Sequence, residues 1–223
     1  MTKRKSFSDG HLAIILIVAI IVIDQLIKIW VKTHLCLGEA IHITDWFYID
    51  FVENKGMAFG MSFLNKYLLT SLRIVAVCLI GYYIAQQVKK GARRFYIILL
   101  SMILAGAAGN IFDSMFYGLI FEQSTPFNVA SFVPFGTGYA DFLTGKVVDM
   151  FYFPLIVTTW PDWMPLVGGN EFIFFSPVFN FADACISVGV ILLLLFCRKD
   201  LEGVVAQDDQ PQDASNETSN ADE

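Results

Sequence analysis

The chain has 223 residues, of which 56% are hydrophobic and 16% are charged, whereas soluble domains average about 45–50% and about 25%. This composition excludes an ordinary soluble globular domain. The 21 Phe, 8 Tyr and 4 Trp residues exclude disorder over most of the length, because chains that cannot fold are poor in aromatic residues. The formal net charge of -6 argues against a nucleic-acid-binding protein.

The first apolar stretch, residues 12–31, is long enough for a transmembrane helix, which needs about 20 mostly apolar residues. Its length, and the lack of an A-x-A-like site after it, argue against a cleaved signal peptide. Asp24 and Lys28 are four residues apart, so their side chains lie on one helical face and can pair. They form either an interfacial pair near the outer end of the helix or part of a site.

A long loop, residues 32–66, follows the first span. Its segment IHITDWFYIDFVEN (41–54) has the alternation and aromatic content typical of strands. The segment NKGMAFG (54–60) indicates a turn punctuated by glycine. The second predicted span, residues 67–88, contains Arg73, which we interpret as an interfacial side chain without a chemical role.

The third predicted span, residues 95–117, combines small residues with polar ones. Its AGAAGNIFD segment (105–113) carries the small residues that allow membrane helices to approach closely. Asn110 and Asp113 follow three residues apart on one face. Polar groups at this depth need buried partners, so both residues are candidates for a site.

A second long loop, residues 118–176, is rich in aromatic residues that are expected to contact the headgroup layer. Asp149 lies near its end, and Asp183 lies at the outer end of the fourth predicted span, residues 177–197. Two carboxylates that converge cannot both ionise cheaply, so one keeps a proton. If Asp149 and Asp183 meet, they satisfy the requirement of aspartyl hydrolysis, in which the ionised carboxylate activates a water and the protonated one polarises the carbonyl.

Nine of the 15 Lys and Arg residues lie in three short segments, 3–5, 89–94 and 198–199. Because positive residues stay in the cytoplasm, we predict that both termini are cytoplasmic and that both long loops face outward, which in bacteria is the periplasm. Residues 200–223 hold eight of the 21 acidic residues and no Lys or Arg, which leaves 13 acidic against 15 basic residues elsewhere. We expect this segment to be a disordered, acidic cytoplasmic tail.

Two classes other than a hydrolase stay open on the residues alone. One is a non-enzymatic membrane protein that binds a lipid headgroup, an ion or a partner helix through its buried Asp residues. The other is a small proton-coupled transporter. His11, His34 and His42 lack a metal-binding pattern, so no metal site is expected, and the sequence contains no nucleophile elbow or phosphate-binding glycine loop.

Five motifs in series resemble the lipoprotein signal peptidase family, also called prolipoprotein signal peptidase or signal peptidase II, over about residues 10–199. They are DQLIK (24–28), NKGMAFG (54–60), GAAGNIFD (106–113), VVDMF (147–151) and FNFAD (179–183). The resemblance implies a membrane all-α bundle of four transmembrane helices, with a small periplasmic β-cradle formed by the first outer loop. Residues 1–199 are then a membrane-embedded peptidase domain of the bacterial inner membrane, with its active site at the periplasmic side.

The resemblance also implies an activity. Family members are aspartyl endopeptidases that remove the signal peptide from diacylglyceryl-modified prolipoproteins, cleaving before the lipidated Cys without a metal or other cofactor. The implied partners are the lipid-modified precursor, membrane lipid and a globomycin-type inhibitor, with no nucleic acid. The catalytic pair carries over to Asp149 and Asp183. Substrate-binding or site-supporting roles carry over to eight further residues: Asp24, Lys28, Asn54, Gly56, Asn110, Asp113, Asn180 and Ala182.

Three features depart from the family pattern. Ser114 stands where the family usually has Arg, and Arg73 is not an evident substitute. The segment before Asp149 is much longer than usual, and Asp141 within it, in YADFL, resembles the motif around Asp149. We prefer Asp149, because VVD followed by an apolar stretch is the closer match. The acidic tail has no counterpart in typical members.

Overall fold

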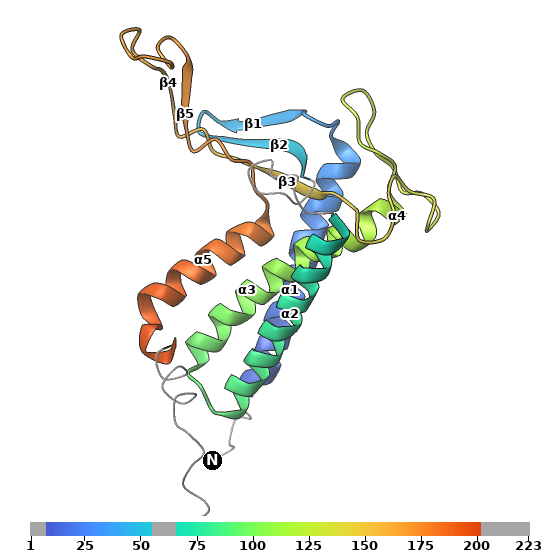
Figure 1. Ribbon diagram of the computed structural model, residues 1–223. Helices are drawn as coiled ribbons and strands as arrows, with labels where there is room; N and C mark the ends of the chain where they lie inside the picture. Colours follow the sequence, from blue (N-terminus) through green and yellow to red (C-terminus); the bar gives the residue numbers. More distant parts are fainter. Residues whose placement is uncertain (1–7, 55–65, 202–223) are drawn as a thin grey trace, which may run out of the picture.

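The computed structural model describes residues 8–54 and 66–201. This part of the chain forms a bundle of long helices at one end and β-structure at the other (Figure 1). The bundle consists of α1 (Asp9–His34), α2 (Lys66–Lys89), α3 (Arg94–Phe112) and α5 (Phe181–Phe196). α3 packs against each of the other three helices. It continues through a π-helical turn, η2 (Asp113–Tyr117), into the short helix α4 (Gly118–Ile120).

Within the described ranges, three helical segments are long and apolar enough to cross a membrane: α1, α2 and the continuous segment Arg94–Ile120. α5 has 16 residues. The sequence predicts a fourth helix from residue 177, but α5 begins only at Phe181. The reason is local: Phe179 is hydrogen-bonded to the backbone of a strand, and Asn180 caps the helix.

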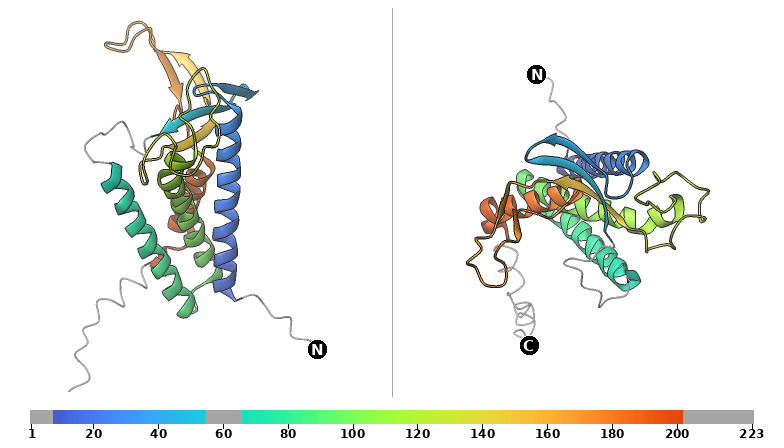
Figure 2. Two further views of the ribbon diagram at one scale, coloured as in Figure 1. Left: turned by 90° about the vertical axis from the view of Figure 1, so that its right-hand side faces the viewer. Right: turned by 90° about the horizontal axis from the view of Figure 1, so that it is seen from above.

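The start of α1, the turn between α2 and α3, and the end of α5 lie at the same end of the bundle (Figures 1 and 2). The Lys and Arg residues of segments 89–94 and 198–199 therefore gather at that end. Asp200 also lies there and pairs with Arg93 at 3.0 Å. The rest of the predicted tail, residues 202–223, lies outside the described residues.

A three-stranded antiparallel sheet lies at the opposite end of the bundle, in the order β1 (Ala40–Thr44), β2 (Phe47–Asn54), β3 (Val147–Tyr152). β1 and β2 lie in the segment where the sequence predicts strands. The first loop thus supplies two strands of the sheet, and the second loop adds the third, β3, which the sequence did not predict. β3 joins the sheet because Val148 and Met150 bury their side chains against α1 and β2, together with Phe51.

The second loop also contributes a hairpin, β4 (Ile156–Thr159) and β5 (Glu171–Phe174), which extends beyond the sheet (Figure 1). The remainder of that loop, residues 118–146, packs against the sheet and α1 around Glu53. Lys32 Nζ lies 2.5 Å from Glu53 Oε1 and Lys146 Nζ lies 2.7 Å from Oε2, while Ser124 Oγ donates to Oε1 at 2.9 Å. Burial opposes ionisation of Glu53, but the two ammonium groups outweigh it and lower its pKa. Residues 118–146 are therefore held to the sheet by Ser124 and Lys146, which both contact the buried Glu53 carboxylate.

Candidate active site

Asp149 lies on β3, in the middle of the segment VVDMFY. Its neighbours Val148 and Met150 are fully buried, and successive side chains of a strand point to opposite faces, so Asp149 faces away from that core. Val52 of β2 lies opposite Asp149 in the sheet. Asp149 itself is only 4% exposed. The strand therefore holds an ionisable group largely out of solvent.

The chain that leads into α5 runs along the other edge of β3. Phe151 N donates to Phe179 O at 2.7 Å, and Phe179 N donates to Phe151 O at 3.1 Å. Asn180 follows and caps α5: its Oδ1 accepts a hydrogen bond from Asp183 N at 2.9 Å, while Asp183 Oδ2 accepts one from Asn180 N at 3.4 Å. This reciprocal capping box fixes Asp183 in the first turn of α5.

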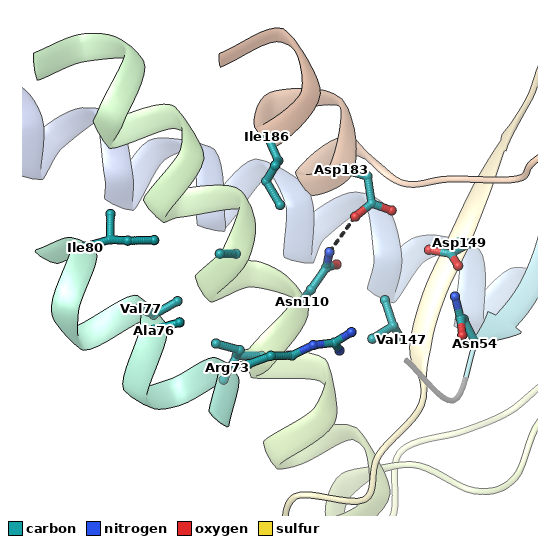
Figure 3. A pocket seen from close by; sticks show the side chains of 12 residues that line it. Asn54, Arg73, Ala76, Val77, Ile80, Asn110, Val147, Asp149, Asp183 and Ile186 are labelled. Atoms are coloured by element: carbon teal, nitrogen blue, oxygen red, sulfur yellow. Dashed lines mark hydrogen bonds between the residues drawn. The ribbon is translucent and has the colours of Figure 1, made fainter. Parts of the chain in front are cut away.

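Two Asn side chains connect Asp149 with Asp183. Asn180 Nδ2 donates to Asp149 Oδ1 at 2.6 Å and to Asn110 Oδ1 at 3.0 Å. Asn110 Nδ2 donates to Asp183 Oδ1 at 2.7 Å. Both Asp side chains line one cavity of about 320 Å³, between α2, α3, α5 and the sheet (Figure 3). The structure thus brings together the two carboxylates that the sequence singles out.

The electrostatics of Asp149 suit a carboxyl group that keeps its proton. Burial, followed by the nearby charge of Asp183, raises its pKa to about 7 against the smaller opposing effect of hydrogen bonds from Asn180 and Asn54. At Asp183, by contrast, the N-terminus of α5 supplies a favourable environment for a negative charge. The pair therefore combines a carboxyl group whose pKa is raised with a second carboxyl group in the first turn of a helix.

A second cluster of charged side chains lies buried beside this pair, between α1 and α3. Lys28 Nζ lies 2.9 Å from Asp24 Oδ2 and 2.8 Å from Asp113 Oδ2, and it donates to Asn110 Oδ1 at 2.7 Å. Lys28, Asp24 and Asp113 are all 0% exposed. An ammonium group has three donors, and each has a partner here. The sequence left the Asp24–Lys28 pair open between interface and site; in the structure the pair is buried inside the bundle, next to Asn110 of the cavity wall.

The cluster holds the backbone directly before each candidate catalytic residue. Asp24 Oδ1 accepts a hydrogen bond from Ala182 N at 3.0 Å, one residue before Asp183. Asp113 Oδ2 accepts one from Val148 N at 3.3 Å, one residue before Asp149. Lys28 joins these two carboxylates, so one lysine links the positions of β3 and α5.

Small residues of α3 allow this close approach. A Cβ atom on Gly106 would lie 2.4 Å from Ala182 O, and one on Gly109 would lie 2.7 Å from Asp24 Oδ2. Both distances are shorter than real Cβ contacts. The small-residue face predicted from AGAAGNIFD is therefore the surface on which the start of α5 and the Asp24 carboxylate rest.

Sequence reasoning missed two polar residues of the buried cluster. Gln25 Nε2 donates to Asp113 Oδ1 at 2.8 Å and to Asp24 Oδ2 at 3.1 Å. Tyr117 OH donates to Gln25 Oε1 at 3.0 Å. Gln25 stands inside an apolar span, and a polar residue at that depth needs buried partners. Its position could therefore have identified Gln25 from the sequence.

The interpretation of Arg73 as an interfacial side chain is wrong. Arg73 reaches from α2 into the cavity that Asp149 and Asp183 line (Figure 3). Its positive charge acts on the Asp183 carboxylate. Arg73 is thus a charged residue of the site that the sequence did not identify.

The structure accounts for Ser114 at the position where the family usually has Arg. Ser114 is 1% exposed, and its backbone oxygen accepts a hydrogen bond from Gly145 N at 2.9 Å. A Cβ atom on Gly145 would lie 2.4 Å from Asp113 O. The returning end of the inserted segment therefore occupies the space beside η2, and a long side chain at position 114 has no room there.

The remaining predicted residues have different outcomes. Asn54 lines the cavity and hydrogen-bonds to Asp149, whereas Gly56 lies outside the described residues. Asp141 is exposed, accepts a hydrogen bond from Tyr67 OH at 3.4 Å, and is not among the cavity-lining residues. In the part of the chain that the structure describes, no three His, Cys, Asp or Glu side chains gather as metal ligands would.

Comparison with known proteins extends these observations. A lipoprotein signal peptidase of Porphyromonas gingivalis (strain ATCC 33277) is 50% identical over 188 residues, which cover 84% of this chain and 83% of the relative. A lipoprotein signal peptidase of Amoebophilus asiaticus (strain 5a2) is 36% identical over 189 residues, covering 82% of this chain and 75% of the relative.

A solved bacterial membrane enzyme, determined by the in meso method at 1.9 Å resolution, shares the fold. Its TM-score is 0.57 at 22% sequence identity, and the match covers 85% of this chain and 94% of that one. The family model described as Signal peptidase (SPase) II matches residues 16–198, a range that includes every residue of the carboxylate pair and the buried cluster. The chain belongs to the signal peptidase II family.

Proposed function

We propose that this chain is a membrane aspartic endopeptidase that removes the signal peptide from diacylglyceryl-modified lipoprotein precursors, cleaving before the lipidated Cys. The observation that carries the proposal is the meeting of Asp149 and Asp183 in one cavity, joined through Asn180. The name shared by the relatives, lipoprotein signal peptidase, supports the substrate class. The non-enzymatic alternative, a protein that binds a lipid headgroup, an ion or a partner helix, is not favoured, because it requires neither this pairing nor membership of a peptidase family.

The geometry suggests how the pair divides the reaction. The Asp183 carboxylate takes a proton from a water molecule, whose oxygen attacks the carbonyl carbon of the scissile peptide bond. Protonated Asp149 donates its proton to the carbonyl oxygen and so stabilises the negative charge that develops there. The tetrahedral intermediate then collapses: the C–N bond breaks, the leaving nitrogen takes the proton from Asp183, and Asp149 recovers its own. The products are a signal peptide with a free carboxyl end and a lipidated Cys with a free amine.

The proposed substrate also determines where the site must lie. We propose that α5 inserts alongside the three longer helices, so that residues 1–199 form a four-helix peptidase domain in the bacterial inner membrane. The Lys and Arg residues at one end of the bundle support cytoplasmic termini, which puts the acidic tail in the cytoplasm and the cavity at the periplasmic side. Cysteines introduced singly in a background without the native cysteines test this orientation. An impermeant maleimide added to spheroplasts is expected to label position 163 and not position 199, and the reverse pattern would invert the topology.

The proposed function has a direct test. Purified protein in detergent is incubated with a diacylglyceryl-modified precursor and with the same precursor lacking the lipid, and the products are identified by mass spectrometry. We expect cleavage immediately before the modified Cys, no requirement for an added metal or cofactor, and inhibition by a globomycin-type compound. Failure to cleave the modified precursor, or cleavage at other positions, would contradict the proposal.

The raised pKa of Asp149 predicts the pH dependence of the reaction. Below about pH 7 Asp149 is protonated and can donate; as the pH rises through about 7 the proton is lost and both carboxylates are negative. We therefore expect kcat/KM to fall above about pH 7, approaching about tenfold per pH unit, with the apparent pKa belonging to the coupled pair. A pH profile of precursor cleavage measures this. A rate that stays constant from pH 6 to pH 9 would show that the acid is not Asp149.

A further inference from the structure

The geometry points to Arg73 as a substrate-positioning residue: its guanidinium group binds backbone carbonyl oxygens of the signal peptide next to the scissile bond. This inference rests on the proposed peptidase function. It names the group that orients the peptide, which the carboxylate pair by itself does not do. The partner of Arg73 is thus a neutral peptide segment in extended conformation.

The wall of the cavity combines acidic, basic and apolar side chains. Among its lining residues, Asp149, Asp183 and Arg73 carry the charges. Asn54 and Asn110 are polar, and the remaining residues are apolar, as Ala76, Val77 and Ile80 of α2 are. The cavity thus has an acidic side formed by β3 and the start of α5, and an apolar side formed by α2 that carries a single cation. An apolar signal peptide fits between two such walls.

The two carboxylates have polar partners on their own side of the cavity. Amide groups of Asn110 and Asn180 donate to Asp183 and Asp149 at 2.7 and 2.6 Å. Arg73 comes from the opposite side, and its guanidinium ends between Asn110 and Val147 in the view of the cavity (Figure 3). A guanidinium has five donors in a planar fork and stays charged at all relevant pH values. It can therefore donate to carbonyl oxygens of a bound peptide while its charge faces the acidic side.

Two hydrogen bonds fix α2 relative to the segment that precedes Asp149. Lys66 Nζ donates to the backbone oxygen of Gly145, and Thr70 Oγ1 donates to that of Leu143 at 3.0 Å. Lys66, Thr70 and Arg73 follow the i, i+4, i+7 spacing of one helical face. The segment that Lys66 and Thr70 contact, residues 143–145, leads into β3. The inserted segment therefore sets the rotation of α2 that directs Arg73 into the cavity.

Binding and turnover of Arg73 variants test this inference. We expect Arg73→Gln to raise KM for the lipidated precursor about 10- to 100-fold, the range for loss of hydrogen bonds to a charged group, with kcat changed less than about threefold. Arg73→Lys keeps the positive charge but loses the planar set of donors of the guanidinium, so its KM is expected to lie between those of wild type and Arg73→Gln. In the inactive Asp149→Asn background, Arg73→Gln should weaken binding of uncleaved precursor by the same factor.

The matched control is Lys89→Gln, which removes a cation from the far end of the same helix, where Lys89 is exposed; its kinetic constants are expected to equal those of wild type. Thermal unfolding checks that each variant is folded. An unchanged KM for Arg73→Gln would overturn the inference. A lowered kcat with a shifted pH profile would also overturn it, because Arg73 would then act on the proton of the carboxylate pair. If the wild type itself does not cleave the precursor, the proposed function fails first, so the two failures are distinguishable.

Discussion

Asp149→Asn and Asp183→Asn are each expected to lower the rate of precursor cleavage by about 10²- to 10⁴-fold, the range for loss of general acid or base catalysis. An amide at either position can neither take a proton from water nor donate one in the cycle. It does keep an oxygen for the hydrogen bonds that Asn180 and Asn110 now donate. The loss should therefore appear in kcat with little change in folding. Single-turnover cleavage of a diacylglyceryl-modified precursor in detergent measures it.

The control for this pair is Asp141→Asn. Asp141 belongs to a motif that resembles that of Asp149, but it is exposed and does not line the cavity. Its replacement should leave turnover within about twofold of wild type. Retained cleavage in Asp149→Asn or Asp183→Asn would remove that residue from the catalytic pair, and a comparable loss in Asp141→Asn would move the site to Asp141.

The largest expected effect on stability comes from Lys28→Met. This change leaves Asp24 and Asp113, both 0% exposed, without their shared counter-charge. Removing one partner of a buried ion pair costs about 3–5 kcal/mol, a large part of the stability of a typical domain. It also releases the backbone before both candidate catalytic residues, since the two carboxylates hold Ala182 N and Val148 N. We expect a strongly lowered Tm in detergent and no detectable cleavage.

Two further variants separate charge from packing in the Lys28 experiment. Lys146→Met also removes a buried-carboxylate partner, but Glu53 keeps Lys32 at 2.5 Å, so the cost should stay below about 1 kcal/mol. Adding Asp24→Asn and Asp113→Asn to Lys28→Met removes the uncompensated charges and should restore part of the lost Tm. A Tm for Lys28→Met equal to that of wild type would contradict the role assigned to the buried cluster.

The helices and the motif residues were predictable from the sequence because their signals are local. Apolar runs of about 20 residues mark the spans. The apolar run put the start of the fourth helix at residue 177, whereas the capping box of Asn180 and Asp183 starts α5 at Phe181. Asp24 and Lys28 were expected to pair from their four-residue spacing. Their burial was not predictable, because it depends on Asp113 from another helix.

Strand β3 and the direction of the Arg73 side chain were not predicted, because both depend on contacts between segments that are distant in the sequence. β3 is six residues long and becomes a strand by pairing with β2, almost a hundred positions earlier in the chain. The direction of Arg73 depends on the rotation of α2, which contacts with Leu143 and Gly145 set. The sequence around Arg73 contains no sign of the contacts with Leu143 and Gly145, so Arg73 was predicted to lie at the membrane interface.

The proposed mechanism requires Asp149 and Asp183 to act as one catalytic unit on one peptide bond. A double-mutant cycle tests it most directly: cleavage rates are measured by single turnover for wild type, Asp149→Asn, Asp183→Asn and the double variant, each confirmed as folded by thermal unfolding. Residues that act as a unit have strongly non-additive effects. We therefore predict that the double variant cleaves no more slowly than the slower single variant. A double-variant rate reduced by the product of the two single effects would contradict a shared catalytic pair.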